Sequence, residues 1–123
     1  MKTISIESIS VPDLVNRFAE LAIAQYQAEL GSDIAKQNRL IKEGWAIVEE
    51  LRTRPNDQRS ALVRLYDHPN IQVRLNAARL TLAVAPQRAR EVIENIAGSK
   101  EYPQAMDAGM CLWALEKGVF KPA

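Results

Sequence analysis

The chain has 123 residues, a length typical of one domain, and its 47% hydrophobic and 25% charged residues are those of an ordinary soluble globular protein. Its 16 basic and 15 acidic residues leave a net charge of +1, so no strong overall field attracts nucleic acid or an anionic membrane. One cysteine and one histidine exclude a disulfide framework and a zinc site built from these two ligands, and we expect neither a metal nor a cofactor.

Residues 1–11 are predicted to form an extended N-terminal arm before a single helical domain at 12–123. Ile4, Ile6 and Ile9 alternate loosely with polar residues, but no second strand-like run is present to pair with them. We therefore expect one or two of these side chains to pack on a helical body. The segment lacks the apolar run of a secretory signal, and no stretch approaches the length of a membrane span. Together with the lone thiol, these features favour a cytoplasmic protein.

The first helix is predicted to begin at Pro12, with Ser10 as a cap, and to end before Gly31 in a left-handed C-terminal position. Ser32 then caps a second helix over about residues 33–52. Because the turn is short, the two helices form an antiparallel hairpin. The apolar face predicted for the second helix consists of Ile34, Ile41, Trp45 and Val48, thickened by Leu40, Ile47 and Leu51.

Four further helices follow in the pattern. The third covers about residues 57–66, and the fourth runs from an Asn70 cap to about Val84, with apolar residues on most of its circumference. The fifth covers about 87–97 after a proline, and the sixth begins near Pro103, ends at Gly118 and is apolar nearly all round. Trp113 in the sixth helix, like Trp45 in the second, is assigned to the core.

These elements pair as three helical hairpins: the first helix with the second, the third with the fourth, and the fifth with the sixth. The predicted fold is therefore all-α, a short HEAT-like α-solenoid of about six helices, and three units are about the minimum for a stable stack. An irregular six-helix bundle is the alternative. It would contain the same helices without superhelical stacking.

Residues 65–80 resemble a HEAT repeat, because an Asp-and-Pro turn is followed by Val73-Arg74, a pair of small residues and Leu80. Over residues 14–122 the chain also resembles a small bacterial family known only as domain of unknown function 2019. The residues that carry this second resemblance are Gly44-Trp45-Ala46-Ile47, the segment from His68-Pro69-Asn70 to Ala77-Ala78, and the ending Asp107-Ala108-Gly109-Met110, Leu112-Trp113-Ala114-Leu115 and Phe120-Lys121-Pro122. The resemblance implies an all-helical, HEAT-like fold and supplies no activity.

No residue set points to catalysis. His68 has only its sequence neighbour Asp67 as an orienting partner, and a His-Pro turn before a helix cap is structural in itself. Cys111 lies on a nearly wholly apolar helix without a base to activate it. Asp107, in the first turns of the same helix, either pairs with Arg74 or Arg79, interacts with the helix dipole, or contributes to a ligand site.

The strongest electrostatic feature is a run of arginines. Between residues 52 and 90 only two aspartates oppose eight basic residues, all of them arginine, which suit bidentate contacts to carboxylate or phosphate. Either they pair with acidic groups of the first, second and sixth helices, or they form a basic face for an acidic partner. The eight residues are Arg52, Arg54, Arg59, Arg64, Arg74, Arg79, Arg88 and Arg90.

The sequence thus predicts a non-catalytic protein-binding module, for example an immunity or accessory protein that blocks its partner, rather than an enzyme. Binding of nucleic acid through the arginines is the alternative, although few aromatic residues accompany them to stack on bases. The oligomeric state and the identity of the protein partner, which we expect to be acidic, stay open. The predicted contact residues are Arg52, Arg59, Arg64, Tyr66, Arg88, Arg90 and Tyr102.

Overall fold

The computed structural model describes residues 5–123 and contains only helices in that range, which confirms the all-α prediction. The two 3₁₀-helices are η1 (Ile6–Ser8) and η2 (Gln58–Asp67). The five α-helices are α1 (Val11–Leu30), α2 (Ile34–Thr53), α3 (Ile71–Leu80), α4 (Pro86–Ala97) and α5 (Gln104–Glu116). The chain divides into two compact units, one ending at Ala61 and the other beginning at Leu62. None of the helices in the described range is both long and apolar enough to cross a membrane.

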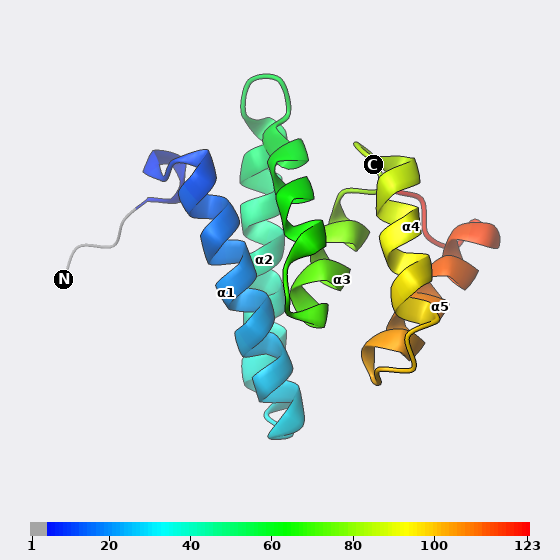
Figure 1. The fold of residues 1–123 in the computed structure, drawn as a ribbon. Helices are drawn as coiled ribbons and strands as arrows, with labels where there is room; N and C mark the ends of the chain where they lie inside the picture. The colour runs from blue at the N-terminus through cyan, green and yellow to red at the C-terminus, as the bar shows by residue number, and fades with distance from the viewer. Residues whose placement is uncertain (1–4) are drawn as a thin grey trace. The chain divides into compact units, whose positions relative to one another are not determined.

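The first unit is built on the α1–α2 hairpin, whose helices lie side by side as predicted (Figure 1). Phe18 of α1 packs where α2 has Gly44, and a Cβ at that glycine would stand at ordinary contact distance, 3.9 Å, from the Phe18 ring. The buried face of α2 contains the residues that the sequence predicted only as additions to the apolar face. Its members are Leu40, Gly44, Ile47 and Leu51.

The cap of α1 is as predicted, but the turn after it differs. The Ser10 hydroxyl accepts the Asp13 N–H at 3.2 Å. Gly31 has a φ of −86°, whereas Ser32 takes the left-handed conformation with a φ of 58°. Asp33, rather than Ser32, caps α2 by accepting the Lys36 N–H at 3.1 Å. The predicted glycine and serine roles are therefore wrong, each by one position.

The N-terminal segment is not a plain extended arm. Ser5 and Ile9 have extended backbones, but between them the chain forms the short helix η1, which lies against α2. Ile6 and Ile9 are half-buried. Ile4 lies outside the described residues.

The second unit consists of α3, α4 and α5, which pack on one another, together with most of η2. α3 is covered on several sides, as its apolar circumference predicted: Val73, Leu75 and Ala77 are completely buried. The helix stops at Leu80 rather than near Val84. Thr81 is the residue that follows this helix end, and its buried hydroxyl donates to the Ala77 carbonyl at 2.7 Å.

The predicted third helix is present over nearly the expected residues, but it is a 3₁₀-helix. Leu62 and Leu65 are buried. Apolar spacing of three residues suits i+3 and i+4 hydrogen bonding alike, so the pattern does not distinguish the two helix types.

A pair of buried amides joins α3 to α5. Gln104, 1% exposed, donates through Nε2 to Oε1 of Gln72 at 3.0 Å, and Gln72, 2% exposed, donates to Asn76 at 2.8 Å. Buried polar groups are tolerated when they are hydrogen-bonded in this way. Sequence reasoning did not find this pair, since neither glutamine occurs in a recognisable motif.

Both tryptophans lie outside the core, which corrects the prediction. Trp45 is 57% exposed and Trp113 is 56% exposed. Trp45 lies on the side of α2 next to the buried side, and Trp113 lies on the side of α5 opposite the buried one. Hydrophobic spacing predicts which residues share a side of a helix and not whether that side meets another helix.

Candidate interaction surfaces

The arginines of the first unit are engaged within the chain. Arg52 forms a bidentate pair with Glu49 at 2.5 and 3.0 Å, both side chains being largely exposed. Its guanidinium lowers the pKa of the Glu49 carboxyl through this hydrogen bond. Arg59, only 12% exposed, binds Asp57 at 2.6 Å and likewise lowers the pKa of that carboxyl. These two predicted contact residues therefore already have carboxylate partners.

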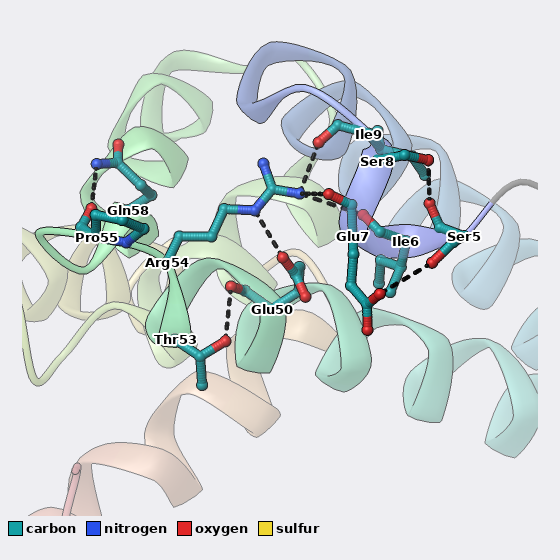
Figure 2. Close-up of polar contacts among 10 residues, drawn as sticks. All are labelled: Ser5, Ile6, Glu7, Ser8, Ile9, Glu50, Thr53, Arg54, Pro55 and Gln58. Atoms are coloured by element: carbon teal, nitrogen blue, oxygen red, sulfur yellow. Dashed lines mark hydrogen bonds and ion pairs between the residues drawn. The ribbon is translucent and has the colours of Figure 1, made fainter.

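Arg54 anchors the N-terminal segment to the end of α2, as Figure 2 shows. Its Nε pairs with Glu50 at 2.7 Å, and both side chains are less than one-fifth exposed. Its Nη2 donates to the carbonyl oxygens of Ile9 at 2.6 Å and Ile6 at 3.2 Å, with a longer contact to Glu7 at 3.5 Å. A guanidinium presents five donors in a fixed fork, so one side chain serves both the carboxylate and the backbone. Sequence reasoning counted Arg54 in the basic run and missed this role.

The arginines of the second unit form fewer ion pairs with the described residues. Arg90 approaches Glu94 at 3.7 Å and Glu116 at 3.3 Å. The Arg88 guanidinium lies 5.7 Å from the centre of the Tyr66 ring, a cation–π distance. Arg64 and Arg88 are both exposed, and neither forms an ion pair with any residue from 5 to 123.

The two tyrosines among the predicted contact residues differ in exposure. Tyr66 is 8% exposed, and its hydroxyl shares a hydrogen bond with the Thr81 hydroxyl. Burial raises the pKa of Tyr66. Tyr66 is therefore a core residue, and its prediction as an exposed contact residue is wrong. Tyr102 is 64% exposed in the turn before α5, which keeps it among the candidate contact residues.

His68 has the structural role that its turn suggested. Its Nδ1 accepts the Asn70 N–H at 3.0 Å, and its carbonyl accepts from Arg74 at 2.7 Å. Asn70 in turn caps α3 by accepting the N–H groups of Gln72 and Val73. Arg74 thus stabilises the turn, rather than pairing with Asp107.

Cys111 is buried at 7% exposure, and burial raises the pKa of its thiol even though Arg79 acts in the opposite direction. Asp107 is half-buried in the first turn of α5, and no ion pair with Arg74 or Arg79 forms. Between residues 5 and 123 the structure has no cluster of three or more His, Cys, Asp or Glu side chains that could hold a metal ion.

An apolar face runs along α2 beside the side that packs on α1. Ile34 is 67% exposed and Trp45 57% exposed, with Ile41 and Val48 half-buried between and beyond them. These four residues, which we call the α2 face, recur at spacings of seven, four and three, so they share one side of the helix. They are the stripe that the sequence assigned to the core.

A second apolar face occupies the solvent side of α5. Met106, Met110 and Trp113 are 60%, 63% and 56% exposed. At 100° per residue they fall within an arc of about 60°, opposite the buried Ala108 and Cys111. We call these three residues the α5 face. Their spacing of four and three was visible in the sequence as helical periodicity, but not their exposure.

The model of the domain of unknown function DUF2019 matches residues 12–116, which include every α-helix except the first residue of α1. The chain belongs to the DUF2019 family. The resemblance noted in the sequence is thereby confirmed. A comparison with curated proteins found no match for this DUF2019 chain.

A solved structure is also similar to this DUF2019 chain. It is the crystal structure of the protein RPA1889 from Rhodopseudomonas palustris CGA009, which is 49% identical and has a TM-score of 0.94. The alignment covers 98% of the present chain and 100% of RPA1889. The likeness therefore extends over the helical fold as a whole.

Proposed function

We propose that this DUF2019 domain is a non-catalytic protein-binding module and that the α2 face is its contact surface. The observation that carries the proposal is Trp45, a large aromatic side chain more than half exposed in the middle of an apolar stripe. Tryptophan is enriched among the residues that dominate binding energies at protein interfaces. Clustered exposed apolar residues are also characteristic of interaction sites.

The partner is expected to present an apolar surface to the α2 face and to be acidic in overall character. Arg64 and Arg88 support the acidic character, since both are exposed and form no ion pair within the described residues. Arg52 and Arg59 contribute less than the sequence suggested, because each would have to exchange an existing carboxylate for a new one. An immunity or accessory protein that covers its partner's active site is one form of such a module. A HEAT-like stack of hairpins would suit this role, because such folds present faces built from successive helices.

The test compares tagged wild-type protein with Trp45→Lys as baits in host lysate at moderate salt. One stoichiometric protein retained by the wild type and lost from the variant supports the proposal. Trp113→Lys is the matched control, because it replaces an equally exposed tryptophan on a different helix. Circular dichroism should show both variants folded.

A second variant tests the acidic character of the partner. Arg64→Glu together with Arg88→Glu should weaken capture of the same protein, and more so at low salt. Equal capture by Trp45→Lys and wild type would contradict the proposal. Nucleic acid that is retained instead and elutes steeply with salt would favour the alternative function.

A further inference from the structure

The α5 face has the features of a surface that pairs with its own copy. We propose that a second copy of this chain docks there, the two α5 helices packing antiparallel about a two-fold axis beside Gly109 and Met110. This goes beyond the proposed function, because it concerns another helix and another partner.

The apolar residues are arranged symmetrically along α5. An antiparallel pair centred between residues 109 and 110 places Met106 opposite Trp113 of the second copy, and Trp113 opposite its Met106. Both side chains are more than half exposed, so each can supply a sulfur–aromatic contact. The same pairing brings Met110 of each copy over Gly109 of the other. Such an interface is isologous, as a closed dimer requires.

No contact within the described chain requires a glycine at position 109. It lies inside α5, where glycine is unfavourable, and a Cβ built at this position would meet nothing within 4 Å. A glycine is useful in a helix where another backbone or side chain approaches closely. Contact with Met110 of a second copy would supply that reason.

The charges also favour the antiparallel orientation. Asp107 lies near the N-terminal end of α5 and forms no ion pair with the described residues, and the exposed Lys117 stands at the C-terminal end. Helical side chains lean toward the N-terminus, so in an antiparallel pair Lys117 of one copy leans toward Asp107 of the other. A parallel pair would instead place both Asp107 residues at one end of the helix pair and both Lys117 residues at the other, with no opposite charge near either.

The contact should be weak, since an interface of one helix from each copy falls below the roughly 1,200 Å² of most stable complexes. We expect a dissociation constant in about the micromolar range. Sedimentation equilibrium of the purified full chain from about 1 to 500 µM measures it. Trp113→Lys should raise the dissociation constant at least about tenfold, whereas Trp45→Lys should change it by less than about twofold.

Gly109→Ala provides a variant that is expected to stay folded, so that a weaker dimer cannot be caused by misfolding. Alanine favours the helix and meets nothing in its own chain, so folding is retained while the dimer weakens by about threefold or more. Charge reversal tests the orientation: Asp107→Lys alone should weaken the dimer, and adding Lys117→Asp should restore it.

Cross-linking in a Cys111→Ala background tests the register. Met110→Cys, beside the axis, should form a disulfide between copies, and Met106→Cys alone should not, whereas Met106→Cys combined with Trp113→Cys should. A monomer throughout the concentration range overturns the proposal, as does a dimer that Trp113→Lys leaves intact or one that Met106→Cys alone cross-links. None of these results affects the test of the α2 face, which uses a different helix and bait capture.

Discussion

Replacing Arg54 with alanine should destabilise the N-terminal unit, because this side chain makes a carboxylate pair and two short backbone contacts away from solvent. The guanidinium is 17% exposed and its partner Glu50 16% exposed, at a separation of 2.7 Å. The carbonyls of Ile6 and Ile9 accept at 3.2 and 2.6 Å. Removing one member of such a set leaves the remaining groups partly desolvated and without their donor.

The magnitude follows from these contacts. Hydrogen bonds to charged groups contribute about 1.5–3 kcal/mol each, and breaking a buried ion pair costs about 3–5 kcal/mol. Both figures are reduced here because water can reach the freed carboxylate and carbonyls in the variant. We therefore expect a loss of about 2–4 kcal/mol for Arg54→Ala. Arg54→Lys should fall between wild type and alanine, since an ammonium keeps the charge and loses the fork.

Arg52→Ala is the matched control two residues away. Its pair with Glu49 is as short, but the side chains are 45% and 61% exposed, so solvent screens the pair and Arg52→Ala should change the stability far less than Arg54→Ala. Urea denaturation followed by circular dichroism compares the variants. Hydrogen exchange of the Ile9 amide, which donates to the Ile6 carbonyl from just after η1, reports release of the N-terminal segment in Arg54→Ala. An Arg54→Ala variant as stable as Arg52→Ala, with unchanged exchange at Ile9, would refute the reasoning.

Two substitutions and one thiol reaction provide further tests on the second unit. Tyr66→Phe removes the hydrogen bond to Thr81 and should cost about 1 kcal/mol by urea denaturation. Burial raises the folded-state pKa of Tyr66, so its contribution is present below the unfolded value near 10 and is lost as pH rises above it. The alkaline fall in melting temperature should accordingly be smaller in Tyr66→Phe, and an identical fall would argue against it. Asn70→Ala should lower stability by about 1 kcal/mol, because two N–H groups at the start of α3 lose their acceptor, and an unchanged urea midpoint would contradict this. Cys111, buried and with a raised pKa, should react with a thiol reagent many times more slowly at pH 8 in the native protein than in urea, and equal rates would show that the thiol is exposed.

The caps and turns were the most predictable local features, and their small errors have a local cause. Ser10 and Asn70 cap α1 and α3 as the sequence suggested, because a short polar side chain before an apolar period has one favourable use there. Between α1 and α2 the chain instead places Ser32 in the left-handed region and uses Asp33 as the cap. Three adjacent residues all suited to turns leave the register of the turn undetermined.

The candidate surfaces were the least predictable. The run of arginines was evident, yet its members have different roles once folded: Arg54 holds the N-terminal segment, Arg74 stabilises a turn, and Arg52 and Arg59 pair with nearby carboxylates. Linear charge counts give the sign of a segment. They do not give the directions in which its side chains point.

Helical periodicity, capping residues and proline positions by themselves determined that the protein is all-α and where most of its helices begin, because these signals act over one or two turns of chain. Only the tertiary structure decided which apolar stripes are covered. On α2 the side with Ile47 packs on α1 while Trp45 stays exposed, and on α5 Cys111 is buried while Trp113 is exposed. Both sides of each helix are apolar enough to be buried, and the side that is buried is the one on which another helix packs. The sides left uncovered are the ones from which we infer binding.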